Sequence, residues 1–330
     1  MRLRRVAFIL MAVALLGWEA WRVLTPATAL RQGPLIVDIP AHAGVLDIAI
    51  RLTRAGVIHS PEGFVVLSVA RGSERTLKAG EYEVPQGAST ARVLRLLESG
   101  KVRRHPVLQP EGATVAELAR ALESARLASA ADVLRVATDR AFLRSHGLDA
   151  PSAEGYLFPD TYQFVRGMTP EQMLGRMIQR MQAKLTDDIR ARARGRGLTV
   201  HQLLTLASII EREAVVRDER QLISAVFWNR LKLGMPLQAD PTVQYAVGKE
   251  RRALTRGDLA TDHPYNTYVN AGLPPGPIAS PGLSAIEAAL DPAAVKYLYF
   301  VAKDDQRHHF SISAAEHNTA VARYRLTRTR

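Results

Sequence analysis

The 330-residue sequence contains no cysteine. This absence excludes a disulfide framework, a thiolate nucleophile and a zinc site built on cysteine ligands, although it does not fix the cellular compartment. The sequence also shows no internal repeat and no low-complexity segment. What is present is an ordinary globular composition, with 47% hydrophobic and 23% charged residues, in a chain long enough for two or three domains.

The charge balance is strongly positive, with a net charge of +12 and a sequence pI near 10.3. Such a chain suits a polyanionic partner, whether nucleic acid, anionic lipid headgroups or an acidic wall polymer. The basic residues are scattered, and their clusters at 2–5, 101–104 and 190–196 are short. This pattern favours a solvated basic surface, and we expect no nucleic-acid partner.

The first residues have the pattern of a membrane-targeting segment. A basic stretch at residues 2–5 is followed by the apolar run Val6–Trp18. A run of this length fits the hydrophobic region of a signal peptide, and Ala27–Ala29 offers a cleavage site of small residues.

The alternative to cleavage is a retained anchor over residues 6–24. Its length of about 19 residues is close to what a bilayer requires, and Trp18, Trp21 and Arg22 could lie at the interface. We expect this anchor, with residues 1–5 as a cytoplasmic stub. Because basic flanks stay inside, the rest of the chain would lie outside the cytoplasm, held at the cytoplasmic (inner) membrane by one span.

Residues 35–104 are expected to form a small α/β module. Hydrophobic periodicity and capping signals predict strand, helix, helix, strand and helix over 35–39, 44–55, 60–69, 77–84 and 93–97. The strand–helix–helix–strand order resembles a LysM-like module, a fold that holds N-acetylated sugar polymers. A generic α+β adaptor is the alternative interpretation.

Residues 105–330 are expected to form a larger, mainly helical domain with irregular loops and a few strands, which makes the fold class α+β. The run 169–194 predicts one long helix that Thr169 caps, with Pro170 at its first position. Other helices are predicted over 114–127, 130–138, 139–146, 218–233 and 313–326, and strands over 106–109, 297–302 and 309–312.

Glu211 lies within the apolar stretch LASIIEREAV at residues 206–215. At about 100° per residue, Glu213 is rotated by about 200° from it and is expected to face the opposite side. The residues within about 60° of Glu211 on the helical wheel are Val200, Leu204, Ala207, Ala214 and Val215. Its carboxyl group is therefore expected to point into the core.

A carboxylic acid on an apolar face has a raised pKa, because burial disfavours its charged form. Such a group can act as a general acid, and glycoside cleavage uses acids of this kind. The alternative is a structural role, in which Glu211 forms an ion pair with a core-facing arginine or lies at a helix–helix seam.

Three later segments are unusually rich in amides, Pro, Gly and Tyr: LQADPTVQY at 237–245, DHPYNTY at 262–268 and GLPPGPIASPG at 272–282. Amides can bond sugar hydroxyls and N-acetyl groups, and tyrosine rings can stack on pyranose rings. The segments are therefore suited to sugar binding, although each residue alone is compatible with ordinary loop chemistry.

Taken with ASIIERE at 207–213, NRL at 229–231 and HFSISAAEHNTAV at 309–321, these segments resemble the endolytic murein (peptidoglycan) transglycosylases, the YceG-like family. The resemblance covers essentially the whole chain, with six motifs in order. EGYLFPDTY at 154–162 matches a further characteristic element. Two departures, His263 where Ser is frequent and Ser280 where Asn is usual, lie in the expected sugar-binding loops and put fine substrate contacts in doubt.

The resemblance implies that Glu211 is the catalytic glutamate and that no metal or cofactor takes part. Asp240 is expected to orient a loop or a substrate hydroxyl. The substrate-contacting residues expected on this basis are Asn229, Gln238, Asp240, Thr242, Tyr245, Tyr265, Asn266, Thr267, Glu154 and Tyr156.

The implied reaction cleaves the β-1,4 bond between N-acetylmuramic acid and N-acetylglucosamine. Protonated Glu211 would donate to the glycosidic oxygen and then, as a carboxylate, take the proton of the muramyl C6 hydroxyl, so that a 1,6-anhydro ring closes. The expected partners are peptidoglycan glycan strands, inner-membrane lipid around the N-terminal helix, and peptidoglycan synthases. Trimming or termination of nascent strands is the expected role.

Two other functions compete with this one. A metal hydrolase is conceivable because His308, His309, Glu316 and His317 cluster near the C-terminus, but neighbouring residues diverge on a strand or a helix. A non-catalytic, membrane-anchored scaffold would hold glycan through the LysM-like module, with Glu211 in a structural role. The size of the second region and its polar loops argue against the scaffold.

Overall fold

The structure is a computed structural model that describes residues 33–249, 251–304 and 307–328, with a few single positions before residue 33. The anchor expected over residues 6–24 and the stub at 1–5 lie almost wholly outside these described residues. Within the described part, none of the helices combines the length and the apolar character that crossing a bilayer requires.

The chain divides into two compact units. One comprises Met1–Pro106 and Gln163–Met168, and the other comprises Val107–Tyr162 and Thr169–Arg330. Helices and small antiparallel sheets occur together, which confirms the expected α+β class.

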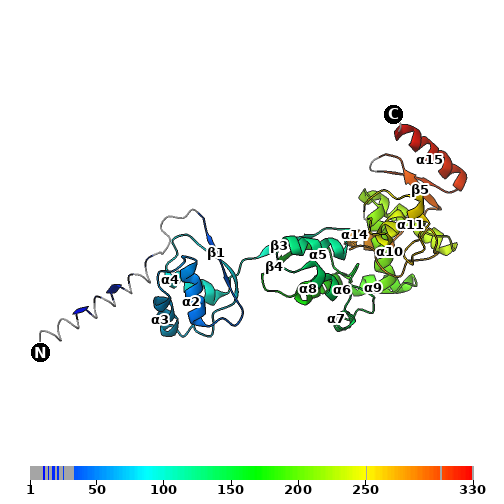
Figure 1. Ribbon diagram of the computed structural model, residues 1–330. Helices are drawn as coiled ribbons and strands as arrows, with labels where there is room; N and C mark the ends of the chain where they lie inside the picture. Colours follow the sequence, from blue (N-terminus) through cyan, green and yellow to red (C-terminus); the bar gives the residue numbers. More distant parts are fainter. Residues whose placement is uncertain are drawn as a thin grey trace, which may run out of the picture. The chain divides into compact units, whose positions relative to one another are not determined.

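The first unit is built on a two-stranded antiparallel sheet in which Val37 lies opposite Tyr82. Side chains on one face of this sheet pack with the helices into a core that includes the fully buried Leu52, Phe64 and Tyr82. The elements, in blue and cyan in Figure 1, are β1 (Leu35–Ile39), α2 (Val45–Arg54), α3 (Pro61–Ala70), β2 (Gly80–Val84) and α4 (Thr90–Ser99).

Local signals place these elements much as expected. Ser60 accepts a hydrogen bond from the backbone N–H of Gly63, and Pro61 occupies the first position of α3. Gly100 ends α4 in the left-handed region, at φ 63°. The second strand is shorter than the expected 77–84, since it begins at Gly80.

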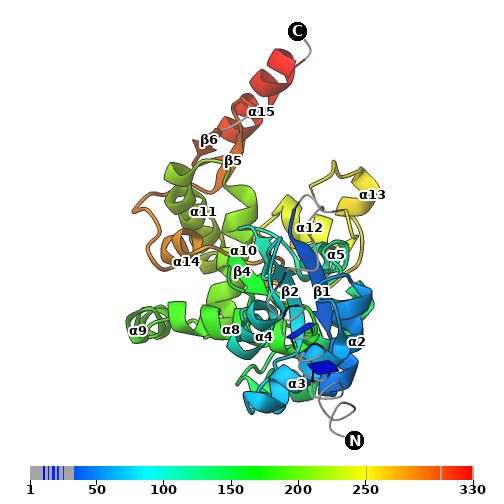
Figure 2. The ribbon, with the colours of Figure 1, turned by 90° about the vertical axis from the view of Figure 1, so that its left-hand side faces the viewer.

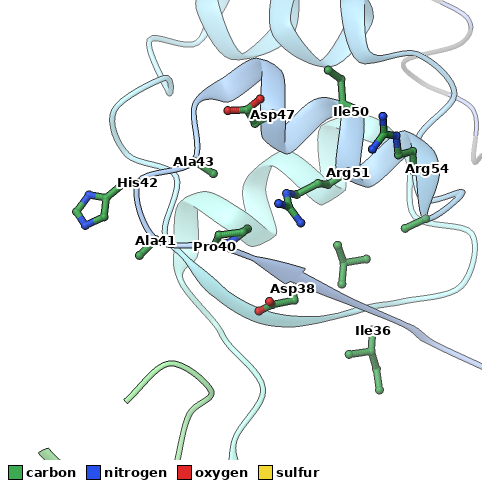
Figure 3. Close-up of a pocket in the computed structure, with 12 residues that line it drawn as sticks. Ile36, Asp38, Pro40, Ala41, His42, Ala43, Asp47, Ile50, Arg51 and Arg54 are labelled. Atoms are coloured by element: carbon green, nitrogen blue, oxygen red, sulfur yellow. The ribbon is translucent and has the colours of Figure 1, made fainter. Parts of the chain in front are cut away.

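A hollow of about 740 Å³ lies between β1 and α2. Figure 3 shows Arg51 and Arg54 projecting from α2, with Asp38 on β1 and His42 on the connecting turn. Ile36 and Ile50 add apolar surface to the same hollow. It is a mixed polar and apolar concavity on the surface of the first unit.

The remaining sequence contains the third strand, β3 (His105–Gln109), which pairs with β4 (Asp160–Phe164). β4 was not among the strands expected from the sequence. Between them lie α5 (Val115–Ser124), α6 (Ala130–Ala137) and α7 (Arg140–Ser145). Thr114 and Glu117 form a reciprocal capping box at the start of α5.

The prediction of a single helix over residues 169–194 is wrong. This segment forms two helices, α8 (Pro170–Lys184) and α9 (Asp187–Gly195). Leu185 leaves the helical conformation at φ −79°, ψ 73°, and Thr186 caps the next helix by accepting from the N–H of Ile189. The signal was present, since Thr186 is followed by two aspartates suited to a helix N-terminus.

The centre of the second unit is α10 (Val200–Glu213), which packs against α14 (Leu283–Leu290), α11 (Arg220–Lys232), α12 (Asp240–Ala246) and α9. Both ribbon views place α10, α11 and α14 side by side (Figures 1 and 2). Every residue from 203 to 211 is buried. α10 is therefore a central helix enclosed around its circumference, not an amphipathic surface helix.

The segment after α11 was expected to be irregular, but it contains α12, α13 (Arg256–Leu259) and α14. A short 3₁₀ helix, Arg217–Glu219, precedes α11. The chain closes with β5 (Tyr299–Ala302), β6 (His308–Ser311) and α15 (Ala314–Arg328), which confirms the strand–strand–helix order expected there.

Candidate active site

Glu211 lies in the last turn of α10, and its side chain is 5% exposed. One carboxyl oxygen, Oε2, accepts a hydrogen bond of 3.0 Å from the backbone N–H of Gly282. The other, Oε1, accepts a hydrogen bond of 2.6 Å from Nη2 of Arg220. The expectation that Glu211 is buried is confirmed, and the ion pair with a core arginine, left open by the sequence, is also present.

The pKa of Glu211 is raised above its ordinary value, and burial is the largest cause. The bonds from Gly282 and Arg220 act in the opposite direction, and the nearby charge of Glu111 adds to the rise. The position in the last helical turn further disfavours a negative charge, because unpaired carbonyl groups gather there. The carboxyl group is thus enclosed, hydrogen-bonded and more easily protonated than an exposed glutamate.

Three distant segments meet around Glu211. Gly112, which follows β3, donates its N–H to the carbonyl oxygen of Ser280, and Ser280 donates in return to Ala113. Arg212 donates to the carbonyl oxygen of Gly112 at 3.2 Å. The N–H of Ile278 reaches the hydroxyl of Ser208 on α10. The loop 272–282 is therefore fixed on both α10 and the turn after β3.

Ser280, one of the two departures from the family pattern, is fully buried. Its hydroxyl accepts from the side-chain amide of Gln109 at 3.1 Å. A residue in this position supports the loop from within. The doubt about substrate contact therefore concerns the other departure, His263, which is partly exposed and accepts from the N–H of Tyr265.

Glu213 also lies in the last turn of α10, on the side that the helical wheel places opposite Glu211. Its expected side of α10 carries Leu206 and Ile209, and both are fully buried. Burial raises the pKa of Glu213 to about 8, with the charge of Asp240 adding to the rise and Arg212 and Arg230 opposing it. Glu213 keeps partial exposure. The side of α10 opposite Glu211 is therefore enclosed as well.

The polar loops are held together by their own side chains. The hydroxyl groups of Thr242 and Thr267 lie 2.8 Å apart, and Thr267 also accepts from the N–H of Ala239. Asn266 donates to the carbonyl oxygens of Leu259 and Thr261. Since Thr242, Asn266 and Thr267 are at most 1% exposed, their placement suits bracing of the loops, and substrate contact by them stays a prediction.

Other expected contact residues lie nearer to the solvent. Tyr245 and Tyr265 face each other with ring centroids 5.0 Å apart, and both are half-buried. Gln238 and Asp240 are exposed, and Asp240 accepts a 2.6 Å hydrogen bond from the hydroxyl of Tyr268. These groups can present aromatic faces and hydrogen-bonding atoms to a ligand.

Glu154 and Tyr156 belong to the EGYLFPDTY element and are buried. Glu154 accepts from the N–H of Val115 at the start of α5, and burial raises its pKa to about 8. The hydroxyl of Tyr156 lies 2.8 Å from Nδ1 of His201, whose Nε2 lies 2.8 Å from the carbonyl oxygen of Pro275. Both side chains fasten neighbouring segments, and their contact with substrate stays a prediction.

Asn229 and Arg230 on α11 fasten the backbone before β5. Asn229 donates to the carbonyl oxygens of Val295 and Tyr297. Arg230, which sequence reasoning did not single out, donates to the carbonyl oxygens of Leu237 and Leu298. The motif NRL holds two loops by backbone contacts.

The histidines considered for a metal site make other contacts. His308 Nδ1 lies 2.7 Å from Glu219, and the ring of His317 stacks on Tyr299. His309 and Glu316 approach each other at 4.0 Å. In the described part of the chain, no group of three His, Asp or Glu side chains has an arrangement that could hold a metal ion.

A cavity of about 730 Å³ adjoins the partners of Glu211. Arg220, Glu111 and Ser284 line it, together with Phe158 and Leu283. Arg220 and Glu111 were not expected at the site from sequence. The only sequence hint was the alternative in which Glu211 pairs with an arginine.

Comparison with known proteins agrees with the resemblance found in the motifs. An endolytic murein transglycosylase of Bacillus subtilis (strain 168) is 34% identical over 304 residues, which cover 87% of this chain and 84% of that protein. A protein of the same name from Streptococcus pneumoniae (strain D39) is 30% identical over 335 residues, covering 91% of this chain. This chain spans 60% of the length of that pneumococcal protein.

A solved yceG-like protein of Listeria monocytogenes is similar in structure as well as sequence. Its TM-score is 0.62 at 34% identity, and the match covers 88% of this chain and 99% of that one. Residues 37–323 match the model of the family described as YceG-like. With relatives at this identity over most of its length, the chain belongs to the YceG-like family.

Proposed function

We propose that this protein is a lytic transglycosylase that cleaves peptidoglycan glycan strands. The observation that carries the proposal is Glu211, an enclosed carboxyl group with a raised pKa beside a cavity and sugar-compatible loops. Relatives at 30–34% identity are named endolytic murein transglycosylases, which supports the same substrate class.

In the proposed reaction, protonated Glu211 donates to the oxygen of the β-1,4 bond between N-acetylmuramic acid and N-acetylglucosamine. The bond from that oxygen to C1 of the muramyl residue breaks, and the N-acetylglucosamine unit leaves with a free hydroxyl. Glu211, now a carboxylate, accepts the proton of the muramyl C6 hydroxyl while that oxygen bonds to C1. A 1,6-anhydro end results, water is not consumed, and Glu211 regains its proton.

The pair with Arg220 fits both halves of this reaction. While Glu211 is a carboxylate, the guanidinium and the N–H of Gly282 stabilise its charge in an enclosed setting. While Glu211 is protonated, burial favours the neutral form. Tyr245 and Tyr265 would stack on sugar rings, and Gln238 and Asp240 would bond sugar hydroxyls.

We infer further that the first unit is a LysM-like module that holds glycan. The order of β1, α2, α3 and β2 and the mixed hollow beside β1 support this role (Figure 3). The N-terminal apolar segment would retain the chain at the cytoplasmic membrane, with both units outside the cytoplasm. Nascent strands and the synthases that extend them would then be within reach.

Digestion of purified sacculi by the full chain in detergent micelles tests the proposal. An enzyme shortens the glycan strands, and Glu211→Gln stops the shortening without preventing binding. A scaffold retains glycan in a pull-down and never shortens it. Retention without cleavage by the wild-type protein would therefore contradict the proposal.

A further inference from the structure

Arg220 lies between two carboxyl groups, those of Glu111 and Glu211, that are far apart in the sequence. Its Nη2 atom is 2.6 Å from Oε1 of Glu211 and 3.5 Å from Oε2 of Glu111. One guanidinium can neutralise only one carboxylate. Two carboxylates beside a single guanidinium repel each other, and this repulsion favours protonation of the more buried one.

The two acids are not equivalent. The side chain of Glu211 is 5% exposed, whereas that of Glu111 is 41% exposed. A charge on Glu111 is hydrated, and a charge on Glu211 is not. Of the two acids, Glu211 is therefore the one whose protonated form burial favours.

The guanidinium has room to change partners. Its Nη1 atom donates to the hydroxyl of Ser284, and its Nε atom is buried without a hydrogen-bond partner among the described residues. Arg220 and Glu111 both line the 730 Å³ cavity. A movement of less than 1 Å would bring the Glu111 contact from 3.5 Å into the range of a charged hydrogen bond.

We propose that Glu111 is a positioning residue that takes Arg220 from Glu211 whenever Glu211 carries the catalytic proton. This inference rests on the function proposed above. When Glu211 gives its proton to the glycosidic oxygen, Arg220 returns to the new carboxylate. When Glu211 takes the C6 hydroxyl proton, Arg220 moves back to Glu111, and no atom or charge is gained or lost in the cycle.

Other charged groups face the same carboxyl group. On α10 itself Arg212 binds the carbonyl oxygen of Gly112, and Arg251 approaches Gly112 from the loop after α12. The charge of Arg212 also acts on the buried carboxyl group of Glu154, whose pKa it lowers. Within the described residues, the only carboxylate besides Glu211 that forms an ion pair with Arg220 is Glu111.

The test compares Glu111→Gln with wild type in the full chain, by the pH dependence of kcat on purified sacculi. Loss of the Glu111 charge removes the second partner of Arg220 and returns the guanidinium to Glu211 permanently. The alkaline limb of the profile, where Glu211 loses its proton, should move to lower pH by about one unit. Glu111→Asp keeps a charge and should shift the limb less.

Glu287→Gln is the matched control, because Glu287 lines the same cavity but pairs with Arg192 at 2.7 Å. Its profile should keep the wild-type alkaline limb. An unmoved limb in a folded Glu111→Gln variant would overturn the inference. An equal shift in Glu287→Gln would also overturn it, since the loss of any negative charge in the cavity would then move the alkaline limb.

A second readout does not need turnover. Carbon-13 NMR of glutamate-labelled protein, assigned through Glu211→Gln, follows the titration of Glu211 directly. The Glu211 resonance should titrate at lower pH in Glu111→Gln, and an unchanged titration would contradict the inference. If wild type shows this titration but never cleaves glycan, the proposed function fails while the coupling of the two acids stands.

Discussion

The backbone N–H of Gly282 donates to Oε2 of Glu211 at 3.0 Å, across 71 residues of sequence. Gly282 is the N-cap residue of α14, so the N–H group that binds Glu211 lies at the start of this helix. The side chain of Glu111 packs directly over the position where a Cβ atom on Gly282 would lie, with its Cγ at 2.9 Å. The backbone of Gly282 thus binds Glu211, and the lack of a side chain there leaves room for Glu111.

We therefore predict that Gly282→Ala impairs the reaction more than the fold. The added methyl group must displace Glu111, and with it the partners of Glu211. Since misplacement by about 1 Å can cost on the order of a hundredfold in rate, kcat on sacculi should fall by about ten- to a hundredfold. Gly257→Ala is the control, since its new Cβ meets only Thr255 Oγ1 at 3.7 Å. Equal rates for the two variants would argue against this role of Gly282.

Gly155 is predicted to be necessary for stability. Its φ is +78°, and a Cβ atom there would overlap the ring of Pro277 in the loop 272–282. Gly155→Ala should lower the free energy of unfolding by about 2–4 kcal/mol, measured by chemical denaturation. Gly147→Ala has a similar φ of +69° with no atom within 4 Å, and should cost only about 1 kcal/mol. Equal losses would mean that the contact with Pro277 adds nothing.

Glu154 should make the fold less stable in alkaline solution. Its pKa is raised by burial from an ordinary 4.5 to about 8, so the folded state holds a proton that the unfolded state releases. Stability must then fall as pH rises from about 4.5 to about 8 and level off above that. The pKa of Glu213 is also raised to about 8, so its contribution to stability falls with rising pH in the same way.

Thermal unfolding from about pH 5 to about pH 8.5 checks this dependence. The melting temperature of wild type should fall more over this range than that of Glu154→Gln, which has no proton to lose there. Glu171→Gln, on an exposed part of α8, should follow wild type. Parallel curves for wild type and Glu154→Gln would show that Glu154 is not the responsible group.

Arg230→Lys tests the backbone clamp after α11. The guanidinium donates to Leu237 and Leu298, which a single ammonium group cannot reach in the same way. Loss of buried charged hydrogen bonds should cost about 3 kcal/mol in the free energy of unfolding. Arg120→Lys, at an exposed position on α5, should be within about 0.5 kcal/mol of wild type. An Arg230→Lys variant with the free energy of unfolding of wild type would contradict this role of Arg230.

The sequence predicts well those features that local chemistry decides. Ser60-Pro61 begins α3, Thr169-Pro170 begins α8, and Gly100 ends α4, because caps and left-handed glycines depend on a few neighbouring residues. The burial of Glu211 was likewise predicted from a local pattern, the apolar stretch at residues 206–215. The break at Thr186 was missed because the hydrophobic periodicity of the flanking segments outweighed a cap signal that was present.

What could not be predicted depends on tertiary contacts. The wheel for α10 assumes one buried face, whereas its neighbours enclose the helix and bury both Leu206 and Ala207. Arg220 and Glu111 reach Glu211 from another helix and from the turn after β3. No spacing in one sequence places such groups together. Thr242 and Asn266 have the residue types of sugar ligands, yet their bonds lie within the protein.

The most direct test of the central claim is mass spectrometry of the products that the full chain releases from purified peptidoglycan, with Glu211→Gln and Glu213→Gln in parallel. We predict 1,6-anhydromuramyl ends from wild type and from a folded Glu213→Gln variant, and none from Glu211→Gln. Reducing ends, one water heavier, would mean that water is the nucleophile. Anhydro ends from Glu211→Gln at the wild-type rate would show that Glu211 is not the acid.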